Sequence, residues 1–381
     1  MLTTLKYCWF FKSFTMAASS EHPNSLKLIQ KMRDASPSTN QLNYKDFIQH
    51  ALYDPEFGYY TRNIDRVGRS DETDFYTSQS IGPMFGALVL AAVKNLIQAY
   101  TDKQTNLRDW AFVEIGYEKD SEWWKPDECP FQNHIRIGPG DAIDFKGPCI
   151  VFSNELFDAQ PFHRVVHLGG QWVELGVNLI SNELTETILP KLSPEVAAFR
   201  NQLPLEAEDG YTIDLPLATI PLAETITSLD WTGLFVAFDY GKPWSHLAHD
   251  FPKGTARAYY RHKQSPDLIA QPGVQDLTCH ICWDWLKDIL VEARFTETTV
   301  ESQEAFFVKH AADHIQRVIS SNPGRFDKNR QSLMQLIHPA TMGQQFQVLS
   351  GFRSDWQERQ PAPIKQPTKK AAPKGDLFNP I

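Results

Sequence analysis

The chain has 381 residues, of which 42% are hydrophobic and 22% are charged, and its formal net charge is −9. This balance suits one large core or two modest domains. The negative charge argues against a nucleic-acid surface, which needs clustered Lys and Arg. It is compatible with a small-molecule site or with a basic protein partner.

The two ends of the chain differ in composition from the rest. Residues 1–25 are expected to be a disordered or leader segment, with basic residues and no acid before Glu21. Such a segment could direct the protein to an organelle, although Met16 could also be the true start. We therefore predict a cytoplasmic protein, with mitochondria as the alternative if the leader is real. The Pro- and Lys-rich segment 357–381 is expected to be a flexible tail.

Residues 26–110 are expected to form an N-terminal helical part that covers the pocket. Apolar residues recur at helical spacing over 44–52, and again after Pro83. Proline suits the first position of a helix. The run from Pro83 to Tyr100 is interrupted by Lys94 and does not reach the roughly 20 apolar residues of a membrane span, so we predict a core helix.

Residues 111–356 are expected to form an α/β domain with insertions. Near-continuous apolar runs at 112–116, 149–153 and 234–238 end in polar residues or glycine, which is typical of buried parallel strands. Gly169-Gly170 between two further runs predicts a hairpin. We also expect a strand at 133–137, a helix over 304–321 and a late strand near 344–351. The predicted core is a mainly parallel sheet with additional antiparallel strands.

The five scattered cysteines do not suggest a disulfide framework and favour a reducing compartment. Cys279 and Cys282 form one CxxC pair. A structural zinc site needs four ligands, usually from two such pairs. We therefore expect two semi-buried thiols and no metal.

Polar residues follow three of the predicted strands. Ligands of open α/β sheets bind beyond the carboxyl ends of the strands, so we expect these side chains to converge on one pocket. An acid at such a position can instead cap the next helix. The residues are Glu114, Gly116, Asn154, Glu155, Asp158, Asp239 and Tyr240.

Six segments then resemble, in order, the MidA-like family of S-adenosylmethionine (SAM)-dependent methyltransferases. This family includes mitochondrial complex I assembly-factor methyltransferases and bacterial relatives. The run Asn-Glu-Leu-Phe-Asp-Ala at 154–159 is similar to its most distinctive motif, and Tyr-Asp-Pro-Glu-Phe-Gly-Tyr-Tyr-Thr at 53–61 to its N-terminal signature. The other segments lie at 74–78, 239–241, 254–262 and 272–280.

The resemblance implies a class I methyltransferase fold, which is Rossmann-like, with SAM as the cofactor and arginine of a protein as the substrate. Methyl transfer to a guanidine needs positioning and a nearby acid. The residues expected to serve these roles are as follows: Glu114, Gly116, Tyr76, Thr77 and Asn154 for the cofactor; Glu155, Asp158 and Asp239 for catalysis; Tyr240, His262 and His280 for the substrate.

The chain departs from the family after Gly116. Only sixteen residues, 117–132, separate it from the strand predicted at 133–137. A βαβ unit needs about 30 residues, so the glycine-rich turn and the second-strand acid of a SAM site have no room here. Gly138-Pro139-Gly140 follows the wrong strand for this role and is expected to make a turn.

Two alternatives to a divergent methyltransferase remain open. One is a catalytically inactive relative that acts as an assembly or interaction factor, since the cofactor turn is short. The other is a hydrolase that uses Asp158 and His163, which the absence of a G-x-S-x-G nucleophile motif disfavours. We expect no nucleic-acid partner and no membrane span.

Overall fold

The computed structural model describes residues 18–19, 22–36, 40–62, 82–101, 106–117, 123–124, 129–180, 183–321 and 327–355. The predicted tail, most of the predicted leader, and the loop residues Tyr76 and Thr77 lie outside the described residues.

The core of the molecule is a six-stranded sheet with the order β16-β17-β10-β5-β3-β4. The four strands at one end of this order run parallel, and β17 is antiparallel to both of its neighbours. The strands are β3 (Ala111–Ile115), β4 (Asn133–Ile137), β5 (Gly147–Asn154), β10 (Trp231–Asp239), β16 (Thr296–Ser302) and β17 (Gln347–Arg353). The predicted Rossmann-like, mainly parallel sheet is confirmed.

Helices cover both faces of this sheet. Alternate strand residues point to opposite faces, so that Phe152 packs beneath one helical layer and Val151 beneath the other. The first layer contains α3 (Pro83–Thr101), α8 (Gln303–His310), α9 (Ala312–Ser320) and α10 (Lys328–Ile337), and the second contains α5 (Thr219–Ser228) and α7 (Trp283–Glu292). The prediction of one continuous helix over 304–321 is therefore wrong. The segment forms two helices, α8 and α9, because the chain leaves helical geometry at Ala311.

Helix α3 begins at Pro83, as predicted, and its apolar residues pack in the core. By length and composition alone α3 could cross a membrane. However, Phe85, Leu88, Val89 and Ala92 are almost completely buried against the sheet and its helices. The prediction of a core helix is confirmed.

A second, antiparallel sheet has the order β1-β8-β7-β6-β9, with β2 also paired to β7. The predicted hairpin at Gly169-Gly170 joins β6 to β7 and is confirmed. Helices α1 (Pro23–Ala35) and α2 (Tyr44–Tyr53) pack on this sheet. The strands are β1 (Ala18–Ser19), β2 (Gln41–Asn43), β6 (His163–Leu168), β7 (Gln171–Ile180), β8 (Glu183–Ile188) and β9 (Thr212–Leu215).

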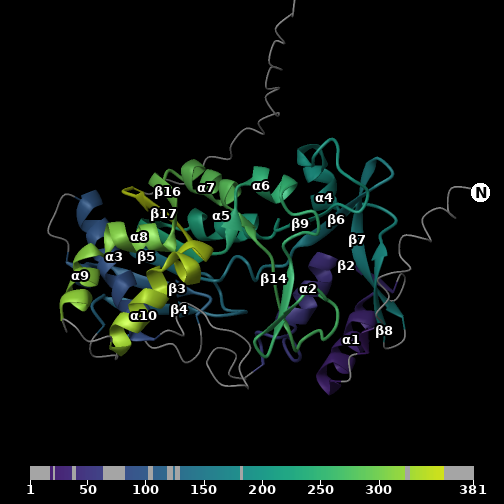
Figure 1. Cartoon of the computed structure of the whole chain (residues 1–381), viewed down its shortest axis with the longest axis horizontal. Helices are drawn as coiled ribbons and strands as arrows, with labels where there is room; N and C mark the ends of the chain where they lie inside the picture. Colours follow the sequence, from purple (N-terminus) through teal and green to yellow (C-terminus); the bar gives the residue numbers. More distant parts are fainter. Residues whose placement is uncertain are drawn as a thin grey trace, which may run out of the picture.

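The segment predicted as one helical part is thus divided between the two sheets. In Figure 1 the parallel strands with α3, α8, α9 and α10 lie on the left, and the antiparallel sheet with α1 and α2 lies on the right. A small three-stranded sheet, β13-β12-β14, belongs to the region between them, where β14 is visible in Figure 1.

The remaining elements are short. The small sheet contains β12 (Arg257–Tyr260), β13 (Lys263–Ser265) and β14 (Asp276–Thr278), and β11 (Gly241–Lys242) pairs with β15 (Ile281–Cys282). Two short helices, α4 (Pro194–Phe199) and α6 (Trp244–His249), and three helical turns, Leu107–Asp109, Arg200–Gln202 and Pro339–Gly343, complete the described chain.

Candidate functional site

A cavity of about 1310 Å³ opens at the carboxyl ends of β3, β4, β5 and β10. After β3 the chain first forms β4 on one side of β3. It then crosses over to form β5 on the other side, so the strand order reverses at β3. Open α/β sheets bind their ligands at such a switch point. The opposite wall comes from α2 and the loop after it, and from the region of β12 to β15.

Gly116 borders the cavity directly after β3. Its φ is +76°, and a Cβ atom at this position would lie 2.9 Å from Leu156 Cδ1. Both facts favour glycine, which has no side chain to clash. The N–H of Gly116 donates to the carbonyl of Ile137 at 2.9 Å, so the pairing with β4 continues to the cavity edge.

The segment after β4 also lines the cavity. It makes the expected turn, in which the N–H of Gly138 donates to Asp141 Oδ2 at 2.8 Å. Because β4 pairs in parallel with β3, this turn lies beside Gly116, and Gly138, Gly140 and Asp141 border the same space. Asp141 is therefore an acid that follows β4, the strand next to β3. The sequence alone did not reveal that this acid lies beside Gly116.

Glu114 does not line the cavity, although we expected it to bind the cofactor. Its carboxylate is buried beneath the helical layer of α3 and accepts a hydrogen bond from Trp123 Nε1 at 2.8 Å. His134 Nε2 lies 3.1 Å from the same carboxylate, and Arg136 Nε lies 3.6 Å from it. Glu114 thus anchors the crossover between β3 and β4.

The described part of this crossover contains no helix. Instead, Trp123 and Trp124 pack their rings against Phe112, with ring centroids 5.4 Å from it in each case. Trp123 also contacts Phe152 edge-on at 4.8 Å. Two indole rings therefore cover apolar surface on this edge of the sheet.

Glu155 occupies a strained position at the end of β5. Its φ is +53°, which costs a residue other than glycine about 1–2 kcal/mol. The conformation is held by the N–H of Glu155, which donates to the carbonyl of Phe238, and by Asn154 Nδ2, which donates to Glu155 Oε1 at 3.0 Å. Such strain is common at functional sites. Glu155 lines the cavity, whereas Asn154 lies behind it.

Asp239 lies behind the cavity, fully buried, and supports the loop after β5. Its carboxylate accepts the N–H groups of Phe157 at 2.9 Å, Asp158 at 3.3 Å and Tyr240 at 2.8 Å. Burial raises the pKa of Asp239 to about 7, and these donors oppose the shift. Its geometry indicates a positioning role in place of the expected direct catalytic one.

Asp158 lines the cavity and is only 4% exposed. Burial, and then the carboxylates of Asp239, Glu155 and Asp276, raise its pKa well above the usual range. Its Oδ1 atom has no hydrogen-bond partner among the described residues. A buried acceptor without a partner is costly and needs an explanation.

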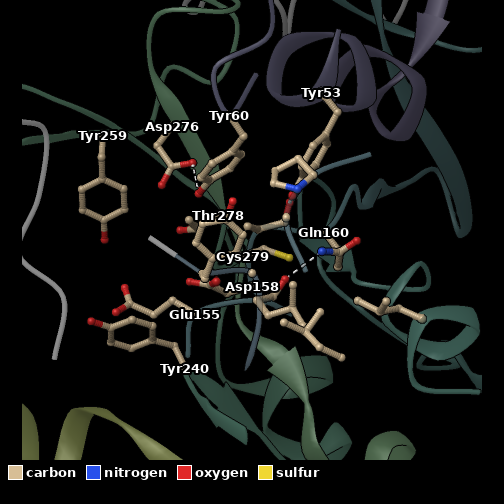
Figure 2. Close-up of a pocket in the computed structure, with 18 of the residues that line it drawn as sticks. Tyr53, Tyr60, Glu155, Asp158, Gln160, Tyr240, Tyr259, Asp276, Thr278 and Cys279 are labelled. Atoms are coloured by element: carbon tan, nitrogen blue, oxygen red, sulfur yellow. Dashed lines mark hydrogen bonds between the residues drawn. The ribbon is translucent and has the colours of Figure 1, made fainter. Parts of the chain in front are cut away.

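Residues 26–110 were expected to cover the pocket, but Tyr53, Tyr60 and Asp276, which form the wall opposite Asp158, were not among the predicted site residues. Tyr60 Oη donates to Asp276 Oδ1 at 2.9 Å, and the Tyr60 ring stacks on Tyr53 with centroids 5.5 Å apart. Tyr53 Oη donates to the carbonyl of Ala159 at 3.1 Å. Figure 2 shows these side chains together with Tyr240 and Tyr259 around Asp158.

The three residues expected to contact the substrate, Tyr240, His262 and His280, all line the cavity. His262 lies in the two-residue turn of the β12–β13 hairpin, and it has a positive φ of +59°, as does Arg261 at +48°. Burial, Lys242 and Arg257 lower the pKa of His280 to about 4, so its ring is neutral at neutral pH.

Cys279 and Cys282 are both free thiols, and they are more deeply buried than the semi-buried thiols that were predicted. Cys279 also lines the cavity, where its sulfur is visible in Figure 2. Within the described residues, no group of three or more His, Cys, Asp or Glu side chains could hold a metal ion.

The fold is similar to a solved bacterial structure. This crystal structure, from Burkholderia thailandensis, has S-adenosyl-homocysteine bound. It superimposes with a TM-score of 0.75 over 87% of this chain and 94% of that one, at 21% sequence identity. The likeness supports the class I methyltransferase-like fold.

Curated relatives match most of the chain at low identity. The mitochondrial protein arginine methyltransferase NDUFAF7 homolog of Drosophila melanogaster is 22% identical, over 88% of this chain and 87% of its own length. The mitochondrial protein arginine methyltransferase NDUFAF7 of Bos taurus is 24% identical, over 92% of this chain and 89% of its own length.

A family profile matches residues 117–300, which include the distinctive run at 154–159. Its description is "Putative S-adenosyl-L-methionine-dependent methyltransferase". The ordered segments, the relatives, the fold and this profile agree, and together they support the MidA-like methyltransferase family.

Proposed function

We propose that this protein transfers a methyl group from SAM to an arginine side chain of a protein. The observation that carries the proposal is the cavity of about 1310 Å³ at the switch point, which the carboxyl-bearing residues Glu155 and Asp158 line and which is large enough for a cofactor and a substrate side chain. The relatives named above as protein arginine methyltransferases support the same reaction.

The residues around the cavity fit SAM. Gly116 allows the backbone to approach a ligand closely, and Gly138 and Gly140 border the adjoining turn. Asp141 is the acid that could accept the ribose hydroxyls. The carboxylates of Glu155 and Asp158 suit a ligand that carries sulfonium and ammonium charges. SAM, when bound, supplies a methyl group that a nitrogen nucleophile can attack.

The chain's own residues would then prepare the substrate nitrogen. A guanidinium must be positioned and must release a proton during methyl transfer. Glu155 and Asp158 are the carboxylates that could receive this proton, and Asp239 holds their loop in place. We propose that Tyr240, His262 and His280 contact the substrate. The roles of Asn154, Tyr76 and Thr77 at the cofactor stay predictions.

Isothermal titration of the full chain with SAM and S-adenosylhomocysteine (SAH) tests the proposal. We expect saturable binding of both, with SAH as tight as SAM or tighter. Methyl transfer from radiolabelled SAM to arginine-containing peptides is then expected, and is lost on Asp158→Asn substitution. If neither ligand gives heat at millimolar concentration, the enzyme proposal fails.

The second candidate function is that of a non-catalytic assembly or interaction factor. The short crossover favours it, because no helix follows Gly116 among the described residues of 117–132. This candidate predicts a stable, folded chain that binds no SAH, and the titration above separates the two.

The names of the relatives also bear on location. They are called mitochondrial, which favours the mitochondrial alternative over a cytoplasmic protein. We propose mitochondrial residence, and imaging of the full chain with a C-terminal fluorescent tag tests it. Diffuse cytoplasmic signal would contradict the proposal.

A further inference from the structure

We propose that Asp276 is the residue that makes the cavity specific for a guanidinium, within an acid–tyrosine chamber formed by Glu155, Asp158, Tyr240, Tyr259 and Asp276. The inference rests on the proposed function and deepens it, because it names the groups that distinguish arginine from other side chains. These residues come from four places in the chain, namely the loop after β5, the end of β10, β12 and β14, and all of them line the cavity.

The first observation is the buried, unpartnered oxygen of Asp158. This side chain lines the cavity, and Oδ1 has no hydrogen-bond partner among the described residues. A ligand that donates an N–H to this atom would remove the cost of leaving it unpaired. A cationic donor would do so most strongly, because hydrogen bonds between charged groups are about twice as strong as neutral ones.

The second observation is the way in which Asp276 is held on the opposite wall. Its Oδ1 atom accepts both the Tyr60 hydroxyl and the N–H of Leu277, each at 2.9 Å. Burial raises the pKa of Tyr60 well above its usual range, so this hydroxyl stays a neutral donor. The carboxyl group of Asp276 therefore has a fixed orientation, although Tyr60 lies 216 residues away in the chain.

The two carboxyl groups suit a fork-shaped cation better than a compact one. Guanidinium is planar and has five N–H donors, so it can contact acceptors along two of its edges at once. The ammonium of lysine is a point charge with three donors at one atom. Asp158 and Asp276 lie near enough to influence each other's charge, and they approach from different walls.

The tyrosine rings of the chamber suit the same ligand. Tyr240 and Tyr259 lie near Glu155 and Asp158, whose charges raise the pKa of both phenols in addition to burial. Guanidinium planes stack on aromatic faces and gain cation–π attraction there. Arg257 also lines the cavity, but its Nη1 atom donates to the carbonyl of Ala256.

The test measures binding of three small probes to the full chain saturated with SAH. The probes are N-acetyl-arginine amide, N-acetyl-lysine amide and N-acetyl-citrulline amide, the last of which has the shape of arginine without its charge. We expect arginine to bind at least tenfold more tightly than lysine or citrulline. Equal binding of citrulline, or no arginine binding at 20 mM, would overturn the proposal.

The variant Asp276→Asn keeps the size of the side chain and an acceptor for Tyr60. It is expected to weaken arginine binding at least tenfold and to change lysine binding much less, while SAH affinity stays within twofold of the wild type. The matched control is Asp313→Asn, an exposed acid in the first turn of α9. Unchanged arginine affinity in Asp276→Asn contradicts the inference.

A second variant covers the case in which Asp276→Asn fails to fold. Tyr60→Phe leaves the carboxylate in place but removes its orienting hydroxyl, and should reduce the ratio of arginine to lysine affinity several-fold. An unchanged ratio also overturns the inference. Failure of the proposed function can be distinguished from failure of this inference, because in the first case the wild-type protein would not bind SAH.

Discussion

The carboxylate of Asp239 accepts the backbone N–H of Phe157 at 2.9 Å, and so ties the end of β10 to the loop that follows β5. The same carboxylate accepts the N–H of Asp158. The acids proposed for catalysis are therefore held by a neighbouring strand of the sheet as well as by contacts within their own segment, such as the hydrogen bond from Asn154 to Glu155.

Replacement of Asp239 by Asn should loosen this loop. Asparagine can place only one acceptor oxygen among three N–H donors, so at least one buried donor loses its partner. We expect a loss of about 1–3 kcal/mol in the free energy of unfolding at pH 8. Urea unfolding measures it, and SAH titration should show a parallel loss of affinity. Wild-type behaviour in both would mean that the loop is held in another way.

Replacement of Gly116 by Val should sharply weaken SAH binding, because the new side chain would meet Leu156 at the cavity edge. Gly147→Val is the matched control, since Gly147 has a similar φ of +77°, open space around it and no place in the cavity. Both variants are expected to lose about 1–2 kcal/mol of stability from backbone strain. If both keep wild-type SAH affinity by titration, the cofactor does not approach Gly116.

Replacement of Asp158 by Asn should change how stability depends on pH. The carboxylates of Asp239, Glu155 and Asp276 face Asp158, and with burial they raise its pKa in the folded protein. The folded state then holds this proton more tightly than the unfolded chain, so wild-type stability falls as pH rises above about 4.

Asparagine has no proton to lose, so Asp158→Asn should be stabilised relative to the wild type at pH 8 and much less at pH 4. Urea unfolding at pH 4, 6 and 8 measures this, with Asp313→Asn as the control. Asp239, whose pKa is raised to about 7, contributes a slope of the same sign in all three proteins. Identical pH profiles for the variant and the wild type would show that Asp158 ionises normally.

Replacement of Glu114 by Gln should affect stability and not the cofactor. The carboxylate is buried and holds Trp123, with His134 and Arg136 nearby. Loss of its charge should cost about 1–3 kcal/mol in the free energy of unfolding, with SAH affinity within twofold of the wild type. Lost SAH affinity at full stability would instead support the role predicted from the sequence.

The parallel strands could be predicted because each is an apolar run that ends in polar residues. Their alignment in one sheet then brought Gly116, Glu155 and Asp158 to one cavity, as expected. The prediction for Glu114 was wrong because successive side chains of a strand point to opposite faces of the sheet. Glu114 is on the same face as Phe112, beneath the helices, and its side chain does not extend to the cavity at the end of the strand.

The far wall of the cavity could not be predicted in this way. Tyr60 and Asp276 meet through contacts between a loop and a small antiparallel sheet, and neither segment has an apolar period that fixes its position. Asp141 was missed because sequence order does not reveal which strand lies beside β3. The break at Ala311 has no Gly or Pro to mark it, so one long helix was expected.

The cavity takes its walls from both halves of the molecule: Tyr53 and Tyr60 belong with the antiparallel sheet, whereas Gly116 and Glu155 belong with the parallel one. A molecule bound there would contact elements of both cores at once. Hydrogen exchange should then slow in α1 and α2 as well as in β3 and β5 when SAH and an arginine ligand bind together. A ligand in the cavity would thus stabilise both cores against local unfolding.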